Sequence, residues 1–326
     1  MIIAGTSDAG PARYLLAMGD SLTKPIQWIG SPISGRIFDE YGQKYRREWS
    51  DVKPDLVLTG TSQGPCIDKE LTKWARRLGA PCVSVVEHWS WYRKRFELDD
   101  ELILPDFIIV NDEIARDQAE ADGLPRDRLI VGGNPWLERL SLESLPEFDR
   151  QAWRSHYGLP SGRLVVFISE ELRGSFPIGS KDYLGYDEFS VLKILRAALP
   201  SDAHLVIKRH PEEPLDKYSE LFHSGEAFQL DSVPLTELAQ GADAIVGMAS
   251  MLLIELAMFR DDVISFRPGA RLPFIGETIS ATTPAEGVSM LSHLLKTPFG
   301  NSTKTFRSRF RGSGARIVEF LNGFTR

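Results

Sequence analysis

Short apolar runs rich in β-branched residues alternate with longer segments of helical spacing along the first half of the chain. Such runs are typical of strands that are buried on both faces of a parallel sheet. The expected strands span residues 1–5, 25–30, 54–60, 81–86, 106–110 and 129–131, and the expected helices span 8–18, 39–50, 67–78 and 112–122. Because strands and helices alternate and glycines follow several strands, the pattern predicts a doubly wound parallel sheet.

The same alternation starts again after a looser, acidic stretch at about 140–158, where a short helix is expected near 149–157. Strands are expected at 163–169, 205–207, 227–230, 242–246 and 263–266, and helices at 186–199, 216–223, 234–240, 250–259, 284–296 and from 303 onward. A chain of 326 residues is long for one hydrophobic core. We therefore expect an α/β protein with two Rossmann-like, doubly wound parallel-sheet domains that face a central cleft.

The expected domain boundaries follow from the loose stretch. The N-terminal domain spans 1–145, a linker spans 146–160, and the C-terminal domain spans 161–302. The tail at 303–326 is expected to be a C-terminal helix, for which packing back across the cleft is one arrangement.

Composition narrows the class of protein. Hydrophobic residues make up 42% and charged residues 25%, which is ordinary for a soluble globular protein. The net charge of −7 argues against a nucleic-acid binder that works through its overall charge. Cys66 and Cys82 form neither a disulfide framework nor a zinc motif, and no leader or apolar run of about 18 residues occurs, so a cytoplasmic location is expected.

Peripheral contact with the inner face of a membrane stays open, because basic residues recur in the tail. They are Lys304, Arg307, Arg309, Arg311, Arg316 and Arg326. Basic residues also favour the last turns of helices, so this pattern has an ordinary structural explanation as well.

Candidate chemistry begins where the strand at 205–207 ends. Lys208, Arg209 and His210 follow the strand, and Pro211 then stops it because proline has no N–H for the sheet. In open α/β sheets, ligands bind at this carboxyl edge, and a phosphate is the natural partner of two cations and an imidazole. An ordinary strand end with solvated cations is the alternative.

A second anion site is expected ahead of the helix at 250–259. The turn Met248-Ala249-Ser250 lies between a strand and this helix, so Ser250 can cap it while free N–H groups face a phosphate. Arg173 and Ser175 follow the first strand of this half, but no glycine-rich phosphate motif accompanies them.

The first half offers three titratable groups at strand exits. Asp8 lies in the first of these loops, where a plain helix cap is the alternative, and Glu87 and His88 follow a buried strand beside two tryptophans. Apolar surroundings of this kind raise the pKa of a carboxyl group.

Aromatic and basic side chains are interleaved directly after this pair. The group consists of Trp89, Trp91, Tyr92, Arg93 and Arg95. Such a segment can stack on sugars, hold an acidic glycan or sit at a lipid headgroup layer. A loop tucked under the domain, with its cations in water, is the alternative.

These segments resemble nucleotide-sugar enzymes of the GT-B architecture. The stretches 53–60, 79–88 and 106–135 resemble UDP-N-acetylglucosamine 2-epimerases. Lys208-Arg-His-Pro211 resembles the His-Pro motif of bacterial sialyltransferases and of teichoic-acid and capsule transferases, and the segment at 243–255 is similar to their serine motif. The epimerases' Asp after the strand, their His-Arg-x-Glu-Asn segment and their paired glycines are replaced here by Gly60-Thr-Ser, by residues 169–174, and by Ala249 and Ser250.

The resemblance implies a glycosyltransferase that moves a sugar or polyol phosphate from a nucleotide donor to a cell-surface glycan or lipid-linked acceptor. It implies that Lys208, Arg209 and His210 hold the donor phosphates, with His210 also a catalytic candidate that can supply a proton, and that Glu255 binds the ribose. A base among Glu87, His88 and Asp8 is expected to activate the acceptor. Direct displacement with inversion is the expected course. The His-Pro likeness favours a cytidine donor, with CMP, CDP and UDP all open.

No Asp-x-Asp triplet occurs in the sequence, so no obligatory metal and no cofactor beyond the donor is expected. Two alternatives stay open. One is an epimerase or hydrolase that turns over UDP-N-acetylglucosamine without an acceptor. The other is a non-catalytic accessory protein that binds nucleotide or glycan.

Overall fold

A computed structural model describes residues 1–19, 21–49, 53–210, 213–222, 227–270, 278–296 and 308–324 of the chain. The chain forms two compact units. The first comprises Met1–Leu142 and Ser308–Arg326, and the second comprises Glu143–Arg307. Residues 150–156, expected in a linker, therefore form a helix of the second unit, and the described part of the tail belongs to the first unit.

The first unit is built on a parallel sheet that has seven strands within the described residues, in the order β3-β2-β1-β4-β5-β8-β9. Its strands are β1 (Ile2–Thr6), β2 (Ile26–Gly30), β3 (Tyr45–Arg46), β4 (Leu56–Thr59), β5 (Cys82–Val86), β8 (Phe107–Val110) and β9 (Leu129–Val131). Its α-helices are α1 (Ala9–Gly19), α2 (Pro32–Glu40), α3 (Ile67–Leu78), α4 (Tyr92–Phe96), α5 (Glu113–Ala121), α6 (Pro135–Leu142) and α14 (Ser313–Leu321). A hairpin of β6 (Glu97–Leu98) and β7 (Glu101–Leu102) follows α4, and a 3-10 turn spans Arg126–Arg128.

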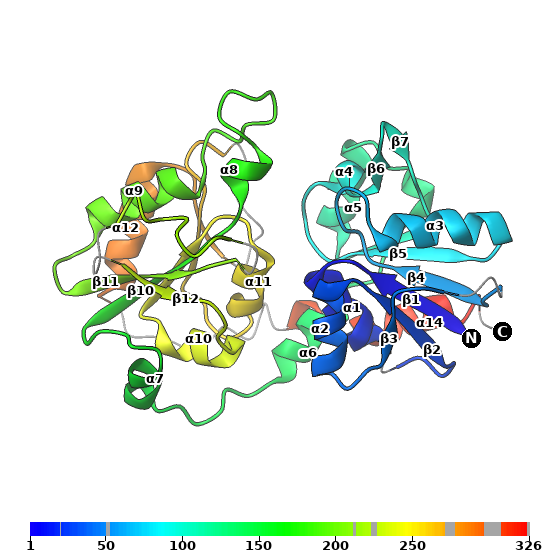
Figure 1. Ribbon diagram of the computed structural model, residues 1–326, viewed down its shortest axis with the longest axis horizontal. Helices are drawn as coiled ribbons and strands as arrows, with labels where there is room; N and C mark the ends of the chain where they lie inside the picture. The colour runs from blue at the N-terminus through cyan, green and yellow to red at the C-terminus, as the bar shows by residue number, and fades with distance from the viewer. Residues whose placement is uncertain are drawn as a thin grey trace. The chain divides into compact units, whose positions relative to one another are not determined.

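The helices cover both faces of this sheet (Figure 1). Successive residues of a strand point to opposite faces, so Ile2 and Ile3 of β1 enter different cores. Ile2 joins the cluster that contains side chains of α1, α2 and α14, whereas Ile3 joins the cluster around Leu71 and Trp74 of α3. This two-sided burial explains why the strands are apolar throughout.

The second unit has a parallel sheet of six strands within the described residues, in the order β12-β11-β10-β13-β14-β15. Its strands are β10 (Arg163–Ile168), β11 (Ala203–Lys208), β12 (Ala227–Leu230), β13 (Ala244–Gly247), β14 (Val263–Phe266) and β15 (Ile279–Ala281). Its helices are α7 (Arg150–His156), α8 (Leu172–Ser175), α9 (Glu188–Ala198), α10 (Leu235–Gly241), α11 (Met251–Ala257) and α12 (Pro284–Leu294). Helix α9 packs against α12, and α10 packs against α7 and α11 (Figure 1).

Two expected helices are wrong. The helix expected at 39–50 is replaced by α2 and the short strand β3, because Ser31 caps α2 in a capping box with Ser34, and Pro32 begins the helix. The described part of the helix expected at 216–223 forms turns, and residue 223 lies outside the described residues. The tail helix begins at Ser313. No helix in the described ranges carries an apolar stretch long enough to cross a bilayer.

Candidate functional site

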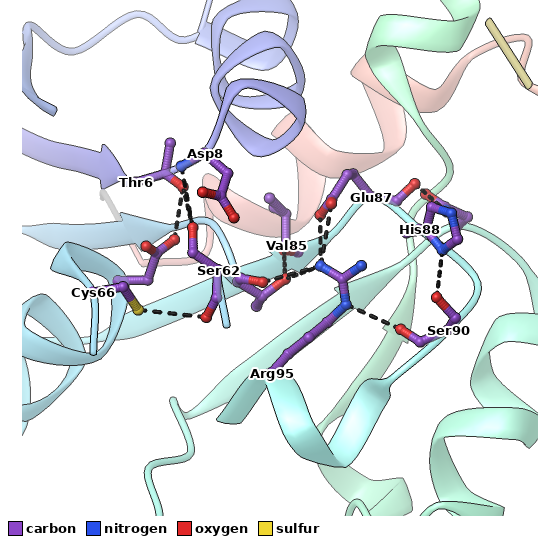
Figure 2. A network of polar contacts seen from close by, with 12 residues as sticks. Thr6, Asp8, Ser62, Cys66, Val85, Glu87, His88, Ser90 and Arg95 are labelled. Atoms are coloured by element: carbon purple, nitrogen blue, oxygen red, sulfur yellow. Dashed lines mark hydrogen bonds and ion pairs between the residues drawn. The ribbon is translucent and has the colours of Figure 1, made fainter. Parts of the chain in front are cut away.

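The order of strands in the first sheet reverses between β1 and β4, because β2 lies on the far side of β1 and β5 on the far side of β4. Ligands in open α/β sheets bind outside the carboxyl ends of the strands at such a reversal. Here the loop after β1 and the loop after β4 contact each other directly. The backbone N–H of Asp8 donates to Ser62 Oγ at 3.1 Å (Figure 2).

Asp68, in the first turn of α3, forms hydrogen bonds with the end of β1 and the loop that follows it. Its carboxylate accepts hydrogen bonds from Thr6 Oγ1 at 2.7 Å and from the backbone N–H of Ser7 at 3.0 Å. A side chain at Gly60 would place its Cβ 2.3 Å from Thr6 Oγ1 and 2.7 Å from Asp68 Oδ1. Glycine therefore allows the two loops to approach this closely.

The Asp8 carboxyl group has a raised pKa. The residue as a whole is exposed, and the surrounding protein still removes part of the water from its carboxyl group. This desolvation, reinforced by the negative charges of Asp68 and Glu87, raises the pKa of Asp8 to about 6. A carboxyl group with this pKa can accept or donate a proton under physiological conditions.

Glu87, after β5, has a fixed cationic partner. Arg95 Nη1 lies 3.2 Å from Glu87 Oε1, and both residues are buried. The same guanidinium donates to the carbonyl oxygen of Thr61 at 3.0 Å and, through Nε, to that of Ser90 at 3.0 Å (Figure 2). Arg95 thus connects the loop after β4 to the loop after β5.

Two buried asparagines hold the backbone of this loop. Asn111 Nδ2 donates to the carbonyl oxygen of Glu87 at 2.9 Å, and Asn134 Nδ2 donates to Asn111 Oδ1 at 3.2 Å. His88 is buried, with Nδ1 2.7 Å from Ser90 Oγ. The structure therefore brings the expected residues Asp8, Glu87 and His88 to one edge of one sheet.

The expected aromatic and basic patch is largely buried, which fits the alternative of a loop tucked under the domain. Trp89 is 5% exposed and donates through Nε1 to Asp112 Oδ2 at 2.7 Å, and Tyr92 is 3% exposed. Both rings help to form the core, and Arg95 forms the buried ion pair with Glu87. Trp91 and Arg93 remain partly exposed, and Trp91 has a φ of 60°.

A backbone with positive φ is strained for a tryptophan, and residues with such strain are found more often at functional sites than elsewhere. Lys94 Nζ lies 5.7 Å from the centre of the Trp91 ring. What remains of the patch is therefore this ring, its lysine and Arg93, which pairs with Glu97 at 2.7 Å.

The cations expected to hold phosphate in the second unit are bound by protein oxygens instead. Lys208 Nζ donates to the carbonyl oxygens of Arg209 at 2.9 Å and Asp231 at 2.7 Å, and burial lowers the pKa of its ammonium group. Arg209 is 7% exposed and pairs with Asp231 Oδ1 at 2.6 Å. This corrects the prediction for both residues, because their charges hold the loops after β11 and β12 together.

His210 is exposed at the same edge, and Pro211 lies outside the described residues. The backbone N–H of His210 donates to Glu213 Oε2 at 3.0 Å. Glu213 also accepts from Ser169 Oγ at 2.6 Å and pairs with Lys217 at 2.9 Å. His210 is thus exposed to solvent, unlike Lys208 and Arg209.

Lys217 is the centre of a largely buried ion cluster. Its Nζ lies 2.6 Å from Glu171, 2.7 Å from Glu188 and 2.9 Å from Glu213. Burial opposes the charge of this ammonium group, but the three carboxylates outweigh burial and raise its pKa. The cluster fixes the loops around the carboxyl edge of the second sheet.

The strand order of the second sheet reverses between β10 and β13, and a carboxylate already occupies this position. Glu170 Oε1 accepts hydrogen bonds from the backbone N–H groups of Ala249 at 2.7 Å and Met248 at 3.2 Å. Burial raises the pKa of Glu170 to about 7, against the effect of these N–H groups and with that of Glu188. The N–H groups expected to face a phosphate therefore face a glutamate.

The remaining expected residues lie around this edge. Ser250 caps α11 and accepts from the N–H of Leu252 at 3.2 Å, and Glu255 is buried in that helix. Arg173 pairs with Asp187 at 2.7 Å, and Ser175 is exposed. In the described ranges, no three His, Cys, Asp or Glu side chains gather with the geometry to hold a metal ion.

Sequence reasoning missed Asp68, Glu170 and the role of Arg95. Asp68 had one local signal, an acid in the first turn of a helix that follows a strand exit. Its contacts with Thr6 and Ser7 join residues about 60 positions apart, and no local pattern reveals them.

The sequence matches no protein-family model, and it matches none of the curated proteins compared with it. Its structure is similar to that of UDP-GlcNAc 2-epimerase from Neisseria meningitidis bound to UDP-GlcNAc, at 14% identity and a TM-score of 0.66, over 99% of this chain and 100% of that one. It is also similar to UDP-GlcNAc 2-epimerase from Methanocaldococcus jannaschii, at 13% identity and a TM-score of 0.63, over 99% and 100% of the two chains.

A third similar structure is that of Anabaena Alr3699/HepE in complex with UDP-glucose, at 11% identity and a TM-score of 0.64, over 99% of each chain. At such low identities, these likenesses establish the fold. The chain has two Rossmann-like units, each built on a parallel sheet, of the GT-B type.

Proposed function

We propose that this chain is a nucleotide-sugar enzyme of the epimerase or hydrolase type, which acts on a UDP-linked sugar without a separate acceptor. The observation that carries the proposal is the pair of acids in the first unit. Glu87 is held by Arg95, and Asp8 keeps a carboxyl pKa of about 6. Two neighbouring acids in different environments are typical of sites that transfer protons.

Asp8 fits the chemistry of both reactions. Epimerisation next to the anomeric carbon requires that a C–H bond is broken and remade on the other face. Hydrolysis requires that a water molecule gives up a proton as its oxygen bonds to the anomeric carbon and the nucleotide diphosphate leaves. In each case a group that accepts a proton near neutral pH is needed, and Asp8 is that group in this proposal.

We assign nucleotide binding to the carboxyl edge of the second sheet, with His210, Ser250 and Glu255 as the residues that contribute. Support comes from the reversal of strand order between β10 and β13 and from the structural neighbours, whose complexes contain UDP-GlcNAc or UDP-glucose. The assignment of the donor shifts from a cytidine to a uridine nucleotide for this reason. No metal or further cofactor is part of the proposal.

A glycosyltransferase is the second candidate. The observation that favours it is the partly exposed, strained Trp91 with Lys94 beside its ring, which together offer a face for a glycan acceptor. The resemblance of Lys208-Arg-His-Pro211 to sialyltransferases and teichoic-acid transferases belongs to this candidate.

The test is to incubate the full chain with UDP-GlcNAc and with UDP-glucose in D₂O and to follow the products by ¹H NMR. Epimerisation gives a stereoisomer that carries deuterium at the inverted carbon, and hydrolysis gives free sugar and UDP. A UDP-dependent thermal shift without turnover favours the transferase or an accessory protein. No response to UDP, CDP, CMP or GDP overturns the nucleotide assignment.

Asp8→Asn is the decisive variant, and Asp39→Asn is its matched control, because Asp39 is an exposed acid of the same unit at the end of α2. We expect Asp8→Asn to lose turnover by roughly 100-fold or more while it keeps the thermal shift with UDP. Asp39→Asn should retain both. Full turnover in Asp8→Asn would exclude Asp8 as the proton acceptor.

A further inference from the structure

Asp68 is a buried acid without a cation of its own. It is 3% exposed, and among the described residues the donors to its carboxylate are the Thr6 hydroxyl and the Ser7 N–H, not a cation. The neighbouring cation, Lys69, turns away and donates to the carbonyl oxygens of Ser62 at 2.7 Å and Gly64 at 2.9 Å. A buried carboxylate without a cation is costly, so its hydrogen bonds need an explanation.

These hydrogen bonds all lead to the loop that carries Asp8. Asp68 Oδ1 accepts from Thr6 Oγ1, and Oδ2 accepts from the N–H of Ser7. Ser7 Oγ accepts in turn from the N–H of Ile67, so the loop and the start of α3 are joined in both directions. The start of α3 therefore fixes the Thr6–Ser7 peptide unit and the Ser7 side chain, which directly precede Asp8.

We propose that Asp68 is a positioning residue for Asp8: it fixes the loop through Thr6 and Ser7, and it places a negative charge without a cationic partner close to the Asp8 carboxyl group. The catalytic part of this inference rests on the proposed function, in which Asp8 accepts the proton. The electrostatic part concerns Asp8 alone and holds whatever the substrate is.

The charges that face Asp8 come from three elements. Asp68 on α3 and Glu87 after β5 are negative, and Arg95 on α4 is positive. Because Arg95 is already paired with Glu87, the charge of Asp68 is the one left without compensation. Burial of the Asp8 carboxyl group is the larger cause of its raised pKa, and the charge of Asp68 adds to it because a second negative charge nearby is unfavourable.

The test measures the ionisation of Asp8 directly, by ¹³C NMR of the full chain labelled at aspartate carboxyl carbons, with Asp8→Asn used to assign the signal. The wild-type midpoint should lie near pH 6. Asp68→Asn should lower the midpoint by roughly one unit, because the charge is lost while an acceptor oxygen remains. Thr6→Val, which removes one hydrogen bond and keeps the charge, should move it much less.

An unchanged midpoint in folded Asp68→Asn overturns the inference. An Asp8 midpoint at the ordinary value near 4 in the wild type overturns it as well, whether or not that variant folds. Turnover separates the two proposals. If Asp8→Asn retains turnover while Asp68→Asn still lowers the midpoint, the proposed function fails and the electrostatic role of Asp68 stands. If Asp8→Asn abolishes turnover while Asp68→Asn leaves the midpoint in place, the reverse holds.

Discussion

The Oε1 atom of Glu170 accepts a hydrogen bond of 2.7 Å from the backbone N–H of Ala249. This contact joins the loop after β10 to the loop after β13, where the strand order of the second sheet reverses. A ligand phosphate that uses the same N–H group has to displace this carboxylate. The ionisation of Glu170 therefore bears on both the stability of the unit and its affinity for nucleotides.

Glu170 should make the protein less stable as the pH rises. Its folded pKa is about 7 against an ordinary value of 4.5, so between these values the folded state holds a proton that the unfolded chain has released. The free energy of unfolding then falls as the pH rises from about 4.5 to about 7 and stays low above that. One pKa unit corresponds to about 1.4 kcal/mol, so a rise of about 2.5 units predicts an effect of roughly 3 kcal/mol.

Glu170→Gln removes this group and keeps an oxygen for the N–H of Ala249. The difference in unfolding free energy between variant and wild type should favour the variant more at pH 8 than at pH 5. Urea unfolding at the two pH values measures it. Glu220→Gln, at an exposed site in the same unit, is the control. A difference that does not change with pH would contradict the prediction.

The rate of the proposed reaction should depend on the ionisation of Asp8. As a proton acceptor Asp8 must be ionised, and its pKa of about 6 predicts that kcat/KM rises with pH and reaches half its maximum near pH 6. The measurement is kcat/KM for UDP-GlcNAc between about pH 4.5 and 8. A rate that falls across this range would assign the opposite role, that of a proton donor.

Removing Arg95 should strongly destabilise the first unit. Arg95→Met leaves the buried carboxylate of Glu87 without its cation, and such a loss costs about 3–5 kcal/mol. Arg93→Met is the matched control, because Arg93 and Glu97 have side chains that are 43% and 35% exposed. The control should cost less than about 1 kcal/mol. Urea unfolding compares the two, and equal losses would show that the Glu87–Arg95 pair has no special weight.

Gly60→Ala should disturb the candidate site directly. Its Cβ would lie 2.3 Å from Thr6 Oγ1 and 2.4 Å from Pro11 Cβ, so the backbone has to move. We expect a loss of about 1–3 kcal/mol in unfolding free energy, together with reduced turnover. Gly10→Ala is the control, because the nearest neighbour of its Cβ is Glu87 Cγ at an ordinary 3.5 Å. A variant Gly60→Ala as stable and active as the wild type would show that the two loops can separate freely.

Local signals in the sequence predicted much of the fold. The helix expected at 67–78 is α3, Ile67–Leu78, and Asp112 caps α5 by accepting from the N–H of Ala115. Helix α2 was missed although Ser31 and Pro32 supply a cap and a first-turn proline, because Ile33 is exposed and its apolar stripe is short. Strand exits were equally clear, which is why Asp8 and Glu87 could be placed at one edge.

Partners that are distant in sequence were not predictable. Lys208 and Arg209 have the pattern of a phosphate site, but Asp231 at the end of another strand binds them both. The sequence pattern around Asp231 does not predict that it pairs with these two cations. The same holds for Glu170 and Ala249, which meet only because β10 and β13 are neighbours in the sheet.

Helix α14 has a consequence for how the protein is made. Its side chains Ile317 and Leu321 lie in the core cluster of the first unit, although the whole second unit precedes them in the chain. Domains generally fold in the order in which they leave the ribosome. Here part of the apolar core of the first unit stays uncovered until the second unit and α14 have been translated. Completion of the first unit therefore depends on the synthesis of the second.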